Sequence, residues 1–195
     1  MLSTHIYWNL ASFLSPTVLS DTLQLPSADR IVAVDAILIP TGELTPVEQT
    51  SLDFRAPKAI GDGALHNSCG AGCTGIDNAF IFSQTDNSSC NVNPKDQVRI
   101  KWHAPETGLT MSVRTNQQGT QLFSCATQDG STVSHVGQGT VPGQAPAIEQ
   151  YGCLVIEPQG WIDGINQPQW GQEALQVFSG ESGVNVNWAE YDFTV

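Results

Sequence analysis

The sequence predicts an all-β protein of antiparallel strands, arranged as a sandwich or an open barrel. Short segments rich in β-branched and aromatic residues, several of them alternating apolar and polar, are separated by turn-forming Gly, Pro, Asn and Asp. No window has apolar residues at i, i+3, i+4 and i+7 for three turns, so helices should be scarce. At 195 residues the chain is long enough for one core, and we expect residues 1–195 to form a single domain.

The expected strands follow one another along the whole chain. Residues 30–39 are β-rich and stop at a turn, Pro40-Thr41-Gly42. Residues 97–102 and 109–115 both alternate and flank a Pro- and Gly-containing connection, which predicts a β-hairpin. Further strands are expected at 78–83, 121–123, 153–156 and 184–193, and the Gly-, Gln-, Ser-, Thr- and Pro-rich residues 130–150 should form a long loop.

Composition limits the partners. The chain has 7 Lys+Arg against 19 Asp+Glu and a net charge of −12, which disfavours nucleic acid and anionic membranes because both need a basic patch. No stretch approaches the roughly 18 apolar residues of a membrane span. A neutral ligand such as a sugar fits this composition better, and we expect a monomer.

The five cysteines fall into two groups. Cys69, Cys73 and Cys90 lie close together in sequence, and Asn87 begins a glycosylation sequon, Asn-Ser-Ser, between them. The alternatives are a disulfide, with Cys90 the favoured participant, and a metal site in which His66 is the nearby candidate; no second Cys/His pair accompanies it, so we expect no metal. Cys125 and Cys153, in apolar strand-like runs, are expected to be buried thiols.

His5 and Glu157 are the candidate acid and base of one active site, at opposite ends of the sequence. An imidazole and a carboxylate suit proton transfer on an uncharged polar substrate. The other histidines, His66, His103 and His135, lie in polar or turn contexts and are expected at the surface.

Five segments in the same order resemble the aldose 1-epimerase (galactose mutarotase) family. Residues 4–10 resemble the family's Asn-His-Thr-Tyr-Phe-Asn-Leu, and residues 38–47 with Asp53-Phe54-Arg55 resemble its most recognisable run. Residues 75–80 are similar to Gly-Tyr-Asp-His-Asn-Phe, and residues 115–123 to Thr-Thr-Gln-Pro-Gly-Val-Gln-Phe-Tyr. Residues 152–168 are similar to the segment that carries the catalytic glutamate.

The resemblance implies an antiparallel β-sandwich of the galactose mutarotase-like type (a supersandwich). It implies an isomerase that interconverts the α and β anomers of a free aldohexose such as glucose or galactose, without a cofactor. By position Glu157 would be the catalytic base and His5 the acid, while Asp77 and Gln121 would bind sugar hydroxyls. Arg55 is expected to be structural.

Each assignment has an alternative. Glu157 could be a solvated edge residue, His5 a core histidine, Asp77 a turn residue, and Gln121 a solvent-facing strand residue. For the whole chain the alternatives are a non-catalytic carbohydrate-binding β-sandwich and a glycosidase in which Asp163 or Asp77 would be the second carboxylate.

The resemblance also implies that the family's N-terminal part is missing, so we expect weak or absent activity. The sequon and clustered cysteines suggest secretion of a full-length form, whereas the N-terminal residues have no signal-peptide pattern, so a cytoplasmic location stays open.

Overall fold

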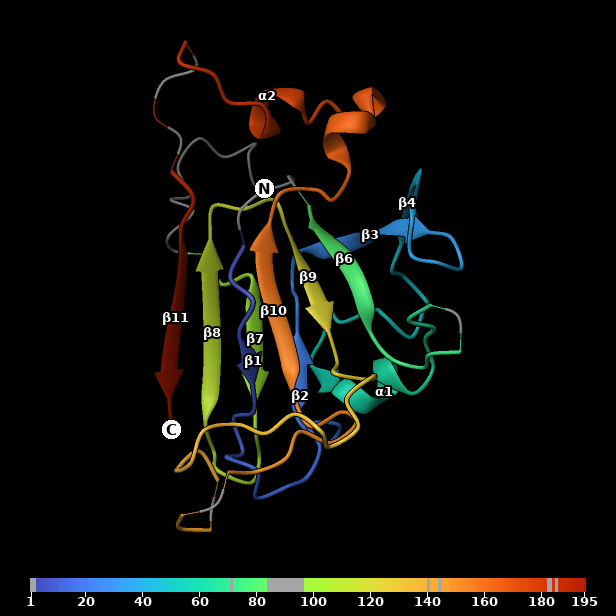
Figure 1. Cartoon of the computed structure of the whole chain (residues 1–195). Helices are drawn as coiled ribbons and strands as arrows, with labels where there is room; N and C mark the ends of the chain where they lie inside the picture. Colours follow the sequence, from blue (N-terminus) through green and yellow to red (C-terminus); the bar gives the residue numbers. More distant parts are fainter. Residues whose placement is uncertain are drawn as a thin grey trace.

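The computed structural model describes residues 3–70, 72–83, 97–139, 141–143, 145–181, 184 and 186–195, which form two stacked antiparallel sheets (Figure 1). The first sheet has six strands in the order β1-β10-β9-β6-β3-β4. In chain order these are β1 (Tyr7–Trp8), β3 (Ala28–Val34), β4 (Pro40–Pro46), β6 (Asp77–Phe82), β9 (Gly119–Phe123) and β10 (Leu154–Gln159). The all-β prediction is therefore confirmed.

The second sheet has five strands in the order β11-β8-β7-β2-β5. These are β2 (Thr22–Gln24), β5 (Lys58–Ala59), β7 (Ile100–His103), β8 (Thr110–Thr115) and β11 (Ala189–Thr194). The predicted hairpin is present, because β7 and β8 pair from Ile100 opposite Val113 to His103 opposite Thr110. The expected strand at 184–193 begins only at Ala189.

The main core lies between the two sheets. Phe80, Leu122 and Ile156 from the six-stranded sheet share one buried cluster with Trp102 and Val113 from the other. Alternation explains this, because every second side chain of a strand points to the same face. The side chains that point the other way from the six-stranded sheet form its outer face.

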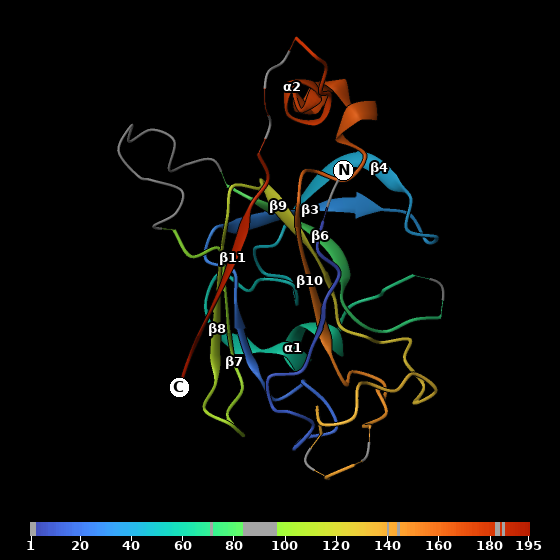
Figure 2. The ribbon, with the colours of Figure 1, turned by 60° about the vertical axis from the view of Figure 1, so that its left-hand side comes forward.

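Helical structure is short. It consists of α1 (Ile60–Ala64), the 3₁₀ turns η3 (Gly164–Asn166) and η4 (Pro168–Trp170), and α2 (Glu173–Gln176). The segment with η3, η4 and α2 lies at the end of the sheets that β10 runs toward, as both views show (Figures 1 and 2). The scarcity of helices was predicted correctly for the described residues.

The expected strand at 30–39 is wrong in its second half. The chain turns at residues 35–39, where the Asp35 side chain accepts hydrogen bonds from the Ile37 and Ile39 amides (3.0 and 2.9 Å). Leu38 adopts φ 66° there. Aspartate favours such turns through side-chain to backbone bonds, and this local preference outweighs the apolar character of the run. Pro40, expected in a turn, instead begins the edge strand β4, a position that tolerates proline.

Two disulfides are present among the described residues. Cys69 bonds to Cys73, so a bridge in the first group is confirmed but the participation of Cys90 is wrong; Cys90 itself lies outside the described residues. Cys125 bonds to Cys153, so the expectation of two buried thiols is also wrong. Both are buried, yet the β9–β10 antiparallel pairing brings the two flanking positions within bonding distance.

Candidate functional site

The candidate site lies on the outer face of the six-stranded sheet, around β10. Glu157 pairs with Gln121 of β9, and Gln121 pairs with Ala79 of β6. On the other side, the β1–β10 register places Tyr7 opposite Val155, so His5, two residues earlier, reaches the level of Glu157. Strand pairing therefore brings residues from opposite ends of the chain into one row.

His5 and Glu157 contact each other, with His5 Nε2 3.5 Å from Glu157 Oε1. The His5 side chain is 52% exposed and the Glu157 side chain 16% exposed. His5 is thus not a core histidine, and Glu157, between β1 and β9, is not a solvated edge residue. Burial raises the pKa of the Glu157 carboxyl above its usual value; His5 partly opposes this, and the Asp77 carboxylate adds to it.

Asp77 and Gln121 form the second half of the row. Gln121 Nε2 donates a 2.6 Å hydrogen bond to Asp77 Oδ1, while Gln121 Oε1 is buried without a partner in the structure. Burial also raises the pKa of Asp77, against the lowering effect of the Gln121 bond. Asp77 begins β6 and Gln121 is half-buried, so neither is a simple turn or solvent-facing residue.

Apolar clusters flank the polar row at both ends. At one end Cys125, Ile148, Cys153 and Val155 are buried together, with Phe123 packed against them. At the other end Val32, Ala79 and Ile81 are buried under side chains that include the edge-to-face pair Trp161 and Trp170. A partly buried polar row between two apolar clusters is suited to a small ligand with both hydroxyl groups and apolar faces.

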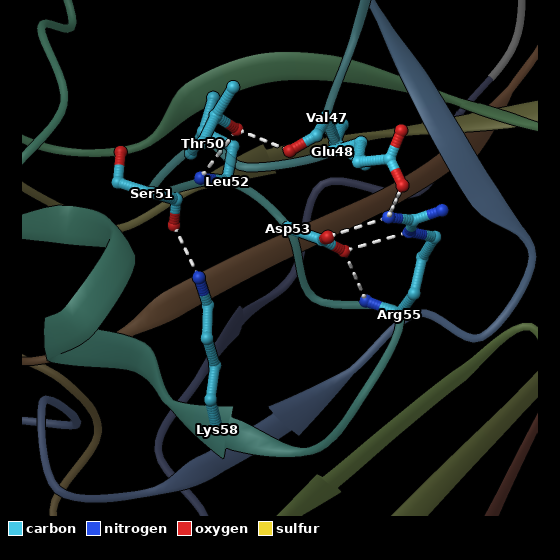
Figure 3. Close-up of polar contacts among 8 residues, drawn as sticks. All are labelled: Val47, Glu48, Thr50, Ser51, Leu52, Asp53, Arg55 and Lys58. Carbon is cyan, nitrogen blue, oxygen red and sulfur yellow. Dashed lines mark hydrogen bonds and ion pairs between the residues drawn. The ribbon is translucent and has the colours of Figure 1, made fainter.

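Arg55 belongs to a different part of the molecule, the segment between β4 and β5. Its guanidinium makes two hydrogen bonds to Asp53 (2.9 and 2.7 Å) and lies 3.8 Å from Glu48 (Figure 3). Nearby, Lys58 Nζ donates to the Ser51 carbonyl (2.6 Å). Arg55 thus holds the pKa of Asp53 below its usual value and ties its own loop together, which is a structural role.

The remaining candidate residues lie elsewhere. His66 and His135 are exposed, as expected, while His103 is half-buried, with its Nδ1 3.0 Å from Thr110 Oγ1. Asn87 lies outside the described residues. The Asp163 carboxylate is occupied by Asn166 and Gln167 of its own turn.

Within the described ranges, no three His, Cys, Asp or Glu side chains lie close enough together to hold a metal ion. The same part of the chain has no helix with the length and apolar character of a membrane span.

One contributor to the site was missed from the sequence. Tyr191 of β11 lies with its hydroxyl 2.8 Å from Thr4 Oγ1, next to His5, and its ring lies 5.5 Å from the Trp8 ring. Phe193 also packs near Trp8, at 5.7 Å. The alternation of residues 184–193 places Tyr191 and Phe193 on one face, and this signal could have identified them as partners of a neighbouring strand.

Known proteins share the sequence pattern over nearly the whole chain. The model of the aldose 1-epimerase family matches residues 1–182. A probable aldose 1-epimerase of Arthroderma benhamiae is 46% identical over 213 aligned residues, which cover 100% of this chain and 48% of that protein. The galactose mutarotase of Mus musculus is 30% identical over 195 residues, covering 97% of this chain and 49% of the mouse protein. The chain thus spans about half the length of these relatives.

Solved structures share the fold. The GalM/aldose epimerase homologue of C. elegans has a TM-score of 0.57 at 22% identity, over 80% of this chain and 40% of that one. Galactose 1-epimerase of Lactobacillus acidophilus has a TM-score of 0.53 at 25% identity, over 81% and 39% respectively. The predicted galactose mutarotase-like sandwich is therefore confirmed.

Proposed function

The chain belongs to the aldose 1-epimerase family, and from this premise we propose that its polar row interconverts the α and β anomers of a free aldohexose. The observation that carries the proposal is the contact between His5 and Glu157, at 3.5 Å, on an accessible face of the sheet. An acid and a base at this distance can serve two oxygens that are bonded to the same carbon, as the ring oxygen and the hydroxyl of C1 are.

In the proposed reaction Glu157 removes the proton from the C1 hydroxyl while His5 protonates the ring oxygen. The C1–ring oxygen bond breaks and the C1–O1 bond becomes the carbonyl of the open-chain aldehyde. Rotation about C1–C2 and closure on the other face, with the two proton transfers reversed, give the other anomer. The raised pKa of Glu157 supports its role as base, because a more basic carboxylate is a better proton acceptor near neutral pH.

Asp77 and Gln121 are proposed to hold sugar hydroxyls. Gln121 Oε1 has no partner in the structure and can accept a hydrogen bond, and the second Asp77 oxygen lies in the same row. This arrangement would orient a sugar beside the acid and base. The two disulfides support a further proposal, that the protein functions in an oxidising compartment.

Polarimetry on freshly dissolved α-D-galactose and α-D-glucose tests the proposal. Glu157→Gln should lower the catalysed rate by about 10²- to 10⁴-fold, since it removes the general base. Glu43→Gln, on the exposed edge strand β4, is the matched control and should retain the rate. A wild-type chain that binds the sugar without accelerating mutarotation would favour the alternative, a non-catalytic carbohydrate-binding sandwich.

A further inference from the structure

A hollow lies beside the polar row, toward the opposite end of the sheets from α2. It has a volume of about 590 Å³ and is enclosed by β1 with the turn that follows it and by the long loop between β9 and β10. These two segments lie close together at the lower end of the molecule in both views (Figures 1 and 2). The volume is in the range of typical small-molecule sites.

The lining of this cavity is neutral and mixed. Tyr7 and Phe13 contribute aromatic rings, while Gln128, Thr132 and Gln138 contribute amide and hydroxyl groups. None of the described residues that line it carries a formal charge, although the chain as a whole carries −12. A neutral ligand with both apolar faces and hydroxyl groups matches this lining, whereas an anion or a metal ion would find no oppositely charged group.

Two side chains of the lining have buried polar atoms without a partner in the structure. These are Trp8 Nε1 and Ser134 Oγ. Buried polar groups are normally paired, because leaving one unpaired is costly. The Trp8 ring packs toward Tyr191 and Phe193, so Ser134 is the hydroxyl relevant to the cavity. A purely apolar ligand would leave Ser134 Oγ unpaired, whereas a ligand with hydroxyl groups can exchange a hydrogen bond with it.

The cavity walls are held in place by the fold. In the loop, Ser134 N donates to the Pro146 carbonyl (2.9 Å) and Ile148 N to the Thr132 carbonyl (2.8 Å). The other wall includes Cys153, which is fixed by its disulfide to Cys125. The ligand would therefore meet a largely preformed site, which lowers the ordering cost of binding.

The cavity also adjoins the acid–base pair. The Tyr7 ring, which lines it, lies 5.1 Å from the His5 ring. Tyr7 is opposite Val155, two residues before Glu157 on the same face of β10. A ligand in the cavity would thus lie beside the paired residues Tyr7 and Val155, which are two residues along the chain from His5 and Glu157 of the polar row.

We propose that this cavity is a second binding site, which takes one neutral saccharide unit through the rings of Tyr7 and Phe13 and the hydroxyl of Ser134. The site binds through the body of the sugar and needs no free C1 hydroxyl. It is independent of the proposed isomerase activity, because none of its residues takes part in proton transfer.

Methyl β-D-galactopyranoside is a suitable probe, because its blocked C1 oxygen prevents ring opening. Titrated into ¹⁵N-labelled full chain, it should shift the amide signals of Gln128 and Ser134. Shifts confined to Gln121 and Glu157 would place the sugar in the row alone and overturn the second site, even if mutarotation is observed. Shifts at Gln128 and Ser134 in a chain without mutarotase activity would support the second site while the proposed function fails.

Substitutions separate binding from folding. Ser134→Ala removes a hydroxyl that has no partner in the free protein, so the free energy of unfolding should be unchanged or higher, whereas the glycoside should bind roughly two- to tenfold more weakly. Ser131→Ala, in the same loop and exposed, is the matched control and should bind normally. Phe13→Leu, which keeps apolar volume but removes the ring, should weaken binding by a similar factor. Unchanged affinity for the glycoside in both Ser134→Ala and Phe13→Leu would overturn the proposal. Benzyl alcohol, an aromatic compound that is not a sugar, is the comparison ligand: shifts of the Gln128 and Ser134 amide signals with benzyl alcohol but not with the glycoside would also overturn it.

Discussion

Asp21 tests how burial in this fold changes the pKa of a carboxyl group and, through it, the pH dependence of stability. It immediately precedes β2 and is 0% exposed. One carboxylate oxygen accepts a 2.9 Å hydrogen bond from Trp102 Nε1, and the other is buried without a partner in the structure. Burial raises its pKa from 3.8 to about 6; the Trp102 bond and His103 oppose the shift, and Glu106 adds to it. The informative perturbation is Asp21→Asn, which keeps the shape and removes the titration.

The shift of about two units corresponds to about 3 kcal/mol. Because the pKa is higher in the folded state, the folded protein binds this proton more tightly than the unfolded chain. The contribution favours folding below the unfolded pKa and is lost as pH rises through about 6. Between about pH 4 and pH 7 the wild type should therefore lose about 2 to 3 kcal/mol more than Asp21→Asn.

Urea unfolding followed by tryptophan fluorescence at a series of pH values measures this difference. Any constant effect of the amide on stability cancels, because only the change with pH is compared between the two proteins. Asp62→Asn, at an exposed position in α1, controls for the removal of one negative charge. Equal pH dependence in wild type and Asp21→Asn would refute the argument that burial destabilises the ionised form of this carboxylate.

Three further predictions concern the site and its supports. Tyr191→Phe, which removes the hydroxyl beside Thr4, should lower the mutarotation rate severalfold and the free energy of unfolding by about 1 kcal/mol. Thr4→Val should lower both quantities by similar amounts. The double variant should show the same rate and stability as either single variant, because both substitutions remove one shared hydrogen bond. Replacing Cys125 and Cys153 by Ala should lower the free energy of unfolding by about 3 to 4 kcal/mol, whereas replacing Cys69 and Cys73 should lower it by about 2 kcal/mol. The difference follows from the sequence separations of 28 and 4 residues, because a longer closed loop restricts the unfolded chain more. A larger loss of stability for the Cys69/Cys73 variant in urea denaturation would contradict this chain-entropy account. Asp77→Asn should move the acidic limb of the pH profile of kcat/KM to lower pH, because the Asp77 carboxylate raises the pKa of Glu157. An acidic limb at unchanged pH would show that Asp77 does not affect the pKa of the base.

Alternation predicted the strands well but not where they turn. The β7–β8 hairpin was found because both arms alternate and a Pro- and Gly-containing segment separates them. The break at residues 35–39 was missed because Ile37, Leu38 and Ile39 continue an apolar run. Asp35 in the middle of that run was the available signal, since its side chain makes the hydrogen bonds that close the turn.

Pairing between distant segments could not be derived from local pattern. Cys125 and Cys153 each lie in an apolar run, and hydrophobicity alone does not show that β9 and β10 are neighbours. The same holds for β1 and β10, which bring His5 to Glu157. The family resemblance predicted that His5 and Glu157 act together, which residue chemistry alone could only suggest. Tyr191, whose hydroxyl contacts Thr4 beside His5, lies beyond residue 182, where the family match ends, so the resemblance could not identify it.

The apolar residues of β10 both stabilise the fold and raise the pKa of Glu157. Residues 153–156 are buried, and they alternate between the two faces of β10: Leu154 and Ile156 enter the main core, while Cys153 and Val155 enter the outer cluster. Glu157 follows on the outer face, so the apolar residues that anchor the strand also withdraw water from its carboxylate. A polar substitution at Val155 would therefore weaken the cluster and lower the pKa of Glu157 together. This coupling explains why a strand so apolar carries a carboxylate at its centre, next to the histidine held by the edge strand.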